Sequence, residues 1–182
     1  GKGIQNFVAH VDRLSRKFEY CGQAWYQREV VIPESWREKD IVLSLERCHW
    51  ETTVYVDGSL VGADERLSTP NRFVVAGQLT PGLHTLTVCV DNRLKYPMDQ
   101  WNHGTTEYTQ TNWNGMVGQL KLEAYPACAI RGMRVDTDID SKKVMVRLRT
   151  GKAKEVPATL ELRVKDKTGK VVGAPTSSVV IN

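Results

Sequence analysis

The polar and aromatic side chains that could bind a ligand are concentrated in one long segment, Asn92–Gly115. Its aromatic and imidazole rings stand among asparagines, glutamines, threonines and glycines: Trp101, His103, Tyr108 and Trp113. Aromatic rings can stack on the apolar face of a ligand, and side-chain amides both donate and accept hydrogen bonds. A loop of this length in a compact domain is uncommon and is often functional. The segment is therefore the first candidate for a binding site.

The other reactive side chains form no catalytic or metal-binding pattern. The four histidines are isolated from one another, no Ser/His/Asp or Cys/His arrangement stands out, and the carboxylates are scattered through turns and strand faces. The four cysteines contain no CxxC pair, which argues against a zinc site and favours free thiols. We therefore expect no catalytic residue, metal or cofactor in this chain.

Composition excludes several classes of partner. The 182 residues are 41% hydrophobic and 25% charged, which is ordinary for a globular protein. The net charge of +4 includes no Lys/Arg run, so we expect no nucleic-acid partner. No apolar run approaches the ~18 residues that cross a bilayer, so we expect no membrane partner. The chain begins without Met and shows no signal peptide.

The elements that must position the long segment are strands, because nearly every periodic stretch has period two. Residues 41–47 and 83–90 alternate apolar and polar side chains, and residues 52–57 lead into Asp57-Gly58, a strong hairpin signal. Residues 8–18 could form one short helix or an irregular strand. The spacing of strands near ten residues predicts an all-β sandwich or barrel.

A second all-β unit follows Tyr125-Pro126. From Ile130 onward the sequence contains no Trp, Tyr or Phe, and Val144, Val146 and Leu148 alternate. We predict two domains, 1–127 and 128–182. An immunoglobulin-like sandwich usually needs ~100 residues, so the second domain is expected to be truncated. Its open sheet edge would invite pairing between two copies of the chain, giving a homodimer.

Four motifs taken together resemble glycoside hydrolase family 2, which includes β-galactosidases, β-glucuronidases and β-mannosidases. They are WYQR at 25–28, WETTVYVDG at 50–58, PGLHTLTVCVDN at 81–92 and NWNGMVG at 112–118. The resemblance spans residues 15 to 125 and implies a jelly-roll (galactose-binding-like) β-sandwich, followed by a partial immunoglobulin-like β-sandwich. In that family the two catalytic glutamates lie on a separate TIM barrel. A retaining glycosidase needs its two carboxyl groups ~5 Å apart.

The resemblance also implies a carbohydrate ligand for the long segment. We expect binding first from Asp91, Asn112 and Trp113, and then from Asn92, Trp101 and His103. Simpler roles remain open: Asp91 and Asn92 could cap a strand, Trp113 could fill the core, and His103 could be a plain loop residue. The remaining aromatics are predicted to pack in the core: Trp25, Tyr26, Trp36 and Trp50.

The leading hypothesis is a non-catalytic N-terminal fragment of a family 2 glycoside hydrolase, which hydrolyses O-glycosyl bonds. The fragment would contribute carbohydrate recognition and support a TIM barrel of the same parent chain. One alternative is an autonomous carbohydrate-binding module, and another is a purely structural sandwich. By analogy with polysaccharide-degrading enzymes, we expect a periplasmic or extracellular location.

Overall fold

The computed structural model describes residues 20–98, 101–102, 104–105, 113–126, 128–151, 156–173 and 176–181. Within these ranges the chain forms antiparallel strands and one short 3-10 turn, η1 (Glu34–Trp36), which confirms the all-β prediction. The chain divides into two compact units, and the boundaries between them along the sequence fall at residues 34/35, 41/42 and 123/124. The last of these lies near the predicted boundary at residue 127. The grouping of residues 35–41 with the second unit was not predicted.

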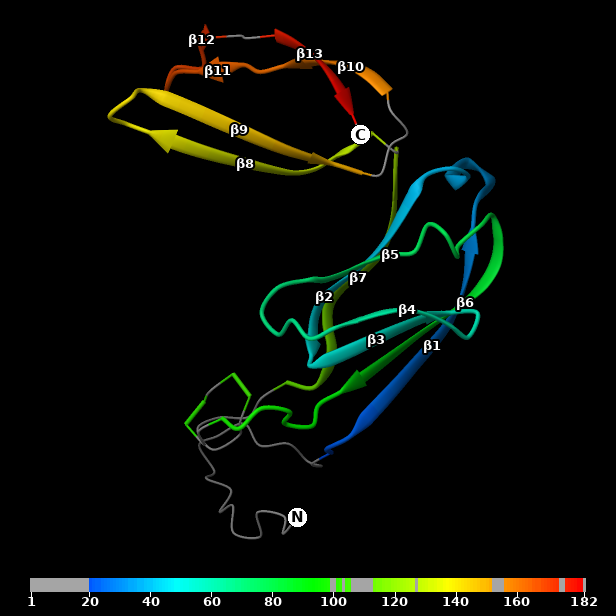
Figure 1. The fold of residues 1–182 in the computed structure, drawn as a ribbon. Coiled ribbons are helices and arrows are strands. Elements are labelled where there is room, and N and C mark those ends of the chain that lie inside the picture. Colours follow the sequence, from blue (N-terminus) through cyan, green and yellow to red (C-terminus); the bar gives the residue numbers. More distant parts are fainter. Residues whose placement is uncertain are drawn as a thin grey trace. The chain divides into compact units, whose positions relative to one another are not determined.

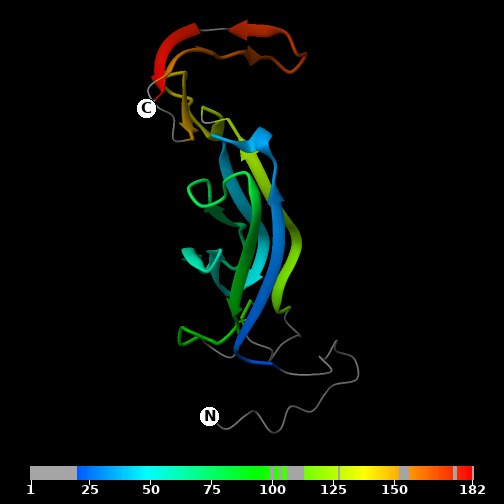
Figure 2. The same cartoon turned by 90° about the vertical axis from the view of Figure 1, so that its right-hand side faces the viewer.

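The first unit is a sandwich of two antiparallel sheets (Figure 1). One sheet contains, in order, β1 (Gln23–Ile32), β6 (Gly82–Asp91), β3 (Glu51–Val56) and β4 (Ser59–Asp64). The other contains β5 (Asn71–Val74), β2 (Asp40–His49) and β7 (Gly115–Tyr125). Figure 2 shows these strands edge-on. The long segment between β6 and β7 therefore connects the two sheets.

Alternation along the strands explains the core of this unit. On β2, Ile41, Leu43 and Leu45 are buried while the residues between them are partly exposed. Val54 on β3 and Val88 on β6 are likewise buried. Because side chains of a strand point alternately to opposite faces, each sheet turns one apolar face inward. The predicted strand alternation is confirmed.

The Asp57-Gly58 turn joins β3 to β4 as predicted. Both residues have positive φ, 49° and 79°, which suits the tight hairpin turns that match strand twist. The Asp57 carboxylate accepts hydrogen bonds from the Thr85 N–H at 2.8 Å and from His84 Nδ1 at 2.6 Å. His84 Nε2 lies 2.7 Å from the Thr80 carbonyl oxygen. The turn is thus fastened to the start of β6.

Two glycines set the path of β7. Gly115 and Gly118 have φ values of 70° and 81°, a region that favours glycine. A Cβ at Gly118 would collide with the Glu46 carboxylate of β2, which accepts a hydrogen bond from the Gln119 N–H at 2.7 Å. A side chain at residue 118 would therefore displace the Glu46 carboxylate and remove this bond between β2 and β7.

Among its described residues, the second unit contains three antiparallel strand pairs. They are β8 (Ile130–Asp138) with β9 (Lys143–Thr150), β10 (Val156–Glu161) with β13 (Thr176–Ile181), and β11 (Val164–Lys165) with β12 (Val171–Gly173). Arg131 forms an ion pair with Asp40 at 2.9 Å and lies over the Tyr125 ring, 4.0 Å from its centroid. The ion pair links Asp40, one of residues 35–41, to β8 of this unit. Its immunoglobulin-like character stays a prediction.

Candidate functional site

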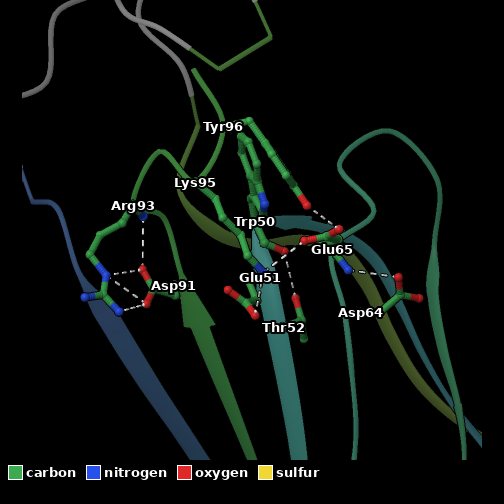
Figure 3. Close-up of polar contacts among 9 residues, drawn as sticks. All are labelled: Trp50, Glu51, Thr52, Asp64, Glu65, Asp91, Arg93, Lys95 and Tyr96. Atoms are coloured by element: carbon green, nitrogen blue, oxygen red, sulfur yellow. Dashed lines mark hydrogen bonds and ion pairs between the residues drawn. The ribbon is translucent and has the colours of Figure 1, made fainter. Parts of the chain in front are cut away.

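The predicted residue Asp91 ends β6, and Arg93 engages its carboxylate. Arg93 donates to Asp91 from its backbone N–H at 3.0 Å and from Nε at 2.9 and 3.0 Å, and Nη2 adds a further ion-pair contact. These bonds are the main cause of the lowered pKa of Asp91. The Asp91 carbonyl also accepts the Trp50 N–H at 3.2 Å. Asp91 therefore orders the strand end and holds Arg93 at the surface (Figure 3).

The predicted residue Asn92 joins three separate chain segments through one amide. Its Oδ1 accepts the Gly22 N–H at 2.7 Å, just before β1. Its Nδ2 donates to the Tyr20 carbonyl at 2.7 Å and to Asn114 Oδ1 at 2.9 Å, just before β7. The two ends of the long segment are therefore held side by side.

Trp113 begins a row of aromatic rings that crosses this end of the sandwich. Its ring lies 5.2 Å from that of His49, and its carbonyl oxygen is hydrogen-bonded to His49 Nδ1. His49 stacks on Trp50 at 6.2 Å, and Trp50 stacks on Tyr96 at 5.9 Å. His49 and Trp50 are buried, Trp113 is half-buried, and Tyr96 is exposed. Trp113 thus packs on the core and also presents part of its ring.

A polar network lies beside this row of rings. Lys95 Nζ contacts Glu51 Oε1 at 3.1 Å and Glu65 Oε2 at 3.2 Å, and the Tyr96 hydroxyl donates to Glu65 Oε1 at 2.7 Å. The Tyr96 bond, and then the Lys95 bond, hold the pKa of Glu65 below its usual value. Figure 3 shows these side chains meeting where β3 begins and where β4 and β6 end. We call the four residues Glu51, Glu65, Lys95 and Tyr96 the strand-end network.

The structure brings Asp91, Asn92 and Trp113 to one end of the sandwich. Trp101 is 63% exposed. His103 and Asn112 lie outside the described residues.

Sequence reasoning missed the strand-end network, His49 and Asn114. The position of Glu51 beside Trp50 at the start of a strand could have marked it as a candidate. Its place opposite Asp91, however, follows only from the register of β3 with β6.

Two of the predicted core aromatics do not lie in the core. Trp50 is buried as expected, and Trp36 is half-buried. Trp25 is 58% exposed and Tyr26 is also exposed, so the prediction that they pack in the core was wrong. Trp25 stands on the face of its sheet that points away from the core, which period two alone cannot distinguish from the inner face.

The chemistry available at this end is binding chemistry. Rings can stack on C–H surfaces, while carboxylate, ammonium and amide groups can bond hydroxyls. Lys95 contacts one oxygen of the Glu51 carboxylate and one oxygen of the Glu65 carboxylate. Among the described residues, no group of three or more His, Cys, Asp or Glu side chains could hold a metal ion. The same part of the chain contains no helix able to span a membrane.

The fold of this chain is similar to parts of solved bacterial glycoside hydrolases. It superposes on a glycoside hydrolase family 2 member from Bacteroides cellulosilyticus with a TM-score of 0.67 and 18% identity, over 91% of this chain and 22% of that one. The β-glucuronidase of Bacteroides uniformis matches with a TM-score of 0.69 and 25% identity, over 89% of this chain and 20% of that one.

The sequence is similar to particular enzymes of the same kind. Rat β-glucuronidase is 25% identical over 183 residues, and pig β-glucuronidase is 24% identical over 191. These alignments cover 87% and 91% of this chain but only 28% and 29% of the enzymes, so the chain spans less than a third of these relatives. No family model matches. The resemblance to glycoside hydrolase family 2 predicted from the motifs is confirmed.

Proposed function

We propose that this chain is the non-catalytic N-terminal portion of a family 2 glycoside hydrolase, acting beside a catalytic TIM barrel of the same parent chain. The observation that carries the proposal is the asymmetry of coverage. About nine-tenths of this chain matches family 2 enzymes, yet it accounts for only 20–30% of their lengths. Export to the periplasm or the extracellular space, and pairing of two copies, belong to the same proposal.

Sugar recognition is assigned to the end of the sandwich where β6 finishes and β7 begins. Trp113 offers part of a ring for stacking, and the exposed Arg93 and Lys95 offer donors to sugar hydroxyls. Their carboxylate partners fix the positions of both cations. Asn92 holds the two ends of the long segment together, so this surface is ordered before a ligand arrives. Binding to an ordered surface loses less conformational entropy.

The parent reading frame provides the first test. We expect it to continue past Asn182 and to encode alternating strands and helices typical of a TIM barrel. A stop codon directly after Asn182 would contradict the proposal.

In the parent enzyme, Trp113→Ala should raise KM for an aryl glycoside, while Val74→Ala on the outer surface of β5 should leave KM unchanged. Equal KM values for wild type and Trp113→Ala would remove Trp113 from the sugar site.

A further inference from the structure

A pair of aromatic rings, Trp25 and Tyr55, stands on the outer face of the sheet formed by β1, β6, β3 and β4. In the strand register, Trp25 of β1 lies opposite Cys89 of β6, and Tyr55 of β3 lies opposite Thr87 of β6. Val54 of β3 is buried in the core, so its sequence neighbour Tyr55 points outward. Trp25 and Tyr55 therefore flank the central strand on the solvent side.

The two rings form a single platform. Their centroids are 5.9 Å apart, and their planes differ by 31°. Trp25 is 58% exposed and Tyr55 is half-buried. Cys89 points to the same open face but is only 5% exposed, which requires large neighbours. Trp25 lies opposite Cys89 in the register and Tyr55 lies opposite Thr87, two residues along β6, so the two rings are the large side chains on this part of the outer face.

The side chains around the platform include hydroxyl and amide groups, together with one exposed apolar residue, Leu60, which lies opposite Tyr55 on β4. Gln27 Nε2 donates to Thr87 Oγ1 at 3.2 Å, and Thr53 lies opposite Cys89 on β3. A protein interface needs a contiguous apolar centre with a polar rim. Here hydroxyl and amide groups adjoin the rings directly. A pyranoside matches this pattern, because each sugar combines an apolar C–H face with hydroxyls at its edge.

The platform continues toward the site described above. In the register of the sheet, Asp91 lies opposite Gln23 of β1 and opposite Glu51 of β3. Glu51 belongs to the strand-end network, so the outer face runs from the aromatic pair to that network along one sheet. An extended ligand on the platform would follow this face across β1, β6 and β3.

We propose that Trp25 and Tyr55 form a second carbohydrate-binding site, for an extended neutral oligosaccharide. The rings stack on successive sugars, and Gln27 and Thr53 bond their hydroxyls. The site is built from this chain alone and does not depend on a catalytic barrel. It therefore goes beyond the proposed function, and either proposal can fail without the other.

The test titrates the 182-residue chain with cellohexaose, xylohexaose and mannohexaose, and follows tryptophan indole N–H signals by NMR. The Trp25 signal, assigned with Trp25→Phe, should shift with at least one of them. Trp25→Ala and Tyr55→Ala should each weaken binding by about tenfold or more. Val74→Ala, an equally exposed apolar residue on the other sheet, should bind like wild type.

Three results would overturn the proposal. The first is the absence of any Trp25 shift with all three hexasaccharides at millimolar concentration in the wild-type chain. The second is unchanged binding by the Trp25→Ala/Tyr55→Ala double variant. The third is binding that disappears in Trp113→Ala but persists in Trp25→Ala, which would place the ligand at the end of the sandwich. The NMR measurement on wild type stands even if a variant fails to fold.

Discussion

Replacing Gly118 by alanine tests how β7 is held against β2. Two separate costs arise. An L-residue in the left-handed region costs about 1–2 kcal/mol, and Gly118 has φ of 81°. The new Cβ also displaces the Glu46 carboxylate, whose hydrogen bond to the Gln119 N–H is worth about 1 kcal/mol at a half-exposed position. We expect Gly118→Ala to lower the free energy of unfolding by about 2–3 kcal/mol.

The assay is urea denaturation followed by tryptophan fluorescence. All five tryptophans precede residue 127, so this signal reports chiefly on the first unit. Gly77→Ala is the matched control, because Gly77 has no positive φ and a Cβ there would meet no atom within 4 Å. Its effect should stay within about 0.5 kcal/mol.

A double-mutant cycle with Glu46→Ala separates the two costs. In that background Gly118→Ala should cost only the backbone part, about 1–2 kcal/mol, because the colliding carboxylate is gone. If Gly118→Ala proves as stable as Gly77→Ala, the reasoning about the left-handed backbone is refuted. If its cost is the same in both backgrounds, the collision with Glu46 plays no part.

Three further predictions concern other contacts. The Asp57 bond raises the pKa of His84 from 6.5. The Thr85 N–H, and then the His84 bond, lower the pKa of Asp57 from 3.8, so the pair stabilises fully between pH 3.8 and 6.5. Raising the pH from about 6 to about 9 should therefore destabilise wild type more than His84→Gln in urea titrations, and parallel losses would contradict this. Asn92→Ala should lower the free energy of unfolding by about 1–3 kcal/mol, because it removes the hydrogen bonds of the amide. An unchanged thermal midpoint in calorimetry would contradict this. Light scattering should show a dimer, and a strict monomer would exclude pairing through open strand edges.

The sequence predicted the parts of the fold that depend on local pattern. Period two located β2, β3 and β6, and Asp57-Gly58 located the hairpin turn, because each signal lies within a few consecutive residues. The pairing of β6 between β1 and β3 could not be predicted, since it depends on contacts between residues far apart in the chain. The exposure of Trp25 was not predicted for a related reason. Alternation shows which residues share a face of the sheet, but not which of the two faces is buried.

The residues of the candidate site also divide into those that local sequence pattern predicted and those that depend on strand pairing. Asp91, Asn92 and Trp113 were found because a strand end and a long polar segment are visible in the sequence. Lys95 was missed because its importance comes from Glu51 and Glu65, which the sheet brings to it from 44 and 30 residues away. Charged residues spaced so widely give no sequence signal until the strand register is known.

The junction at Asn92 depends on its side chain being an amide rather than a carboxylate. Spontaneous deamidation would replace Nδ2, which donates to two oxygens at 2.7 and 2.9 Å, with a carboxylate oxygen. Two hydrogen bonds would become two repulsive oxygen–oxygen contacts, while the bond from Gly22 would survive. A mass change of a single dalton would then loosen the junction of three segments at once. Stored protein could lose its ordered site while keeping its core intact.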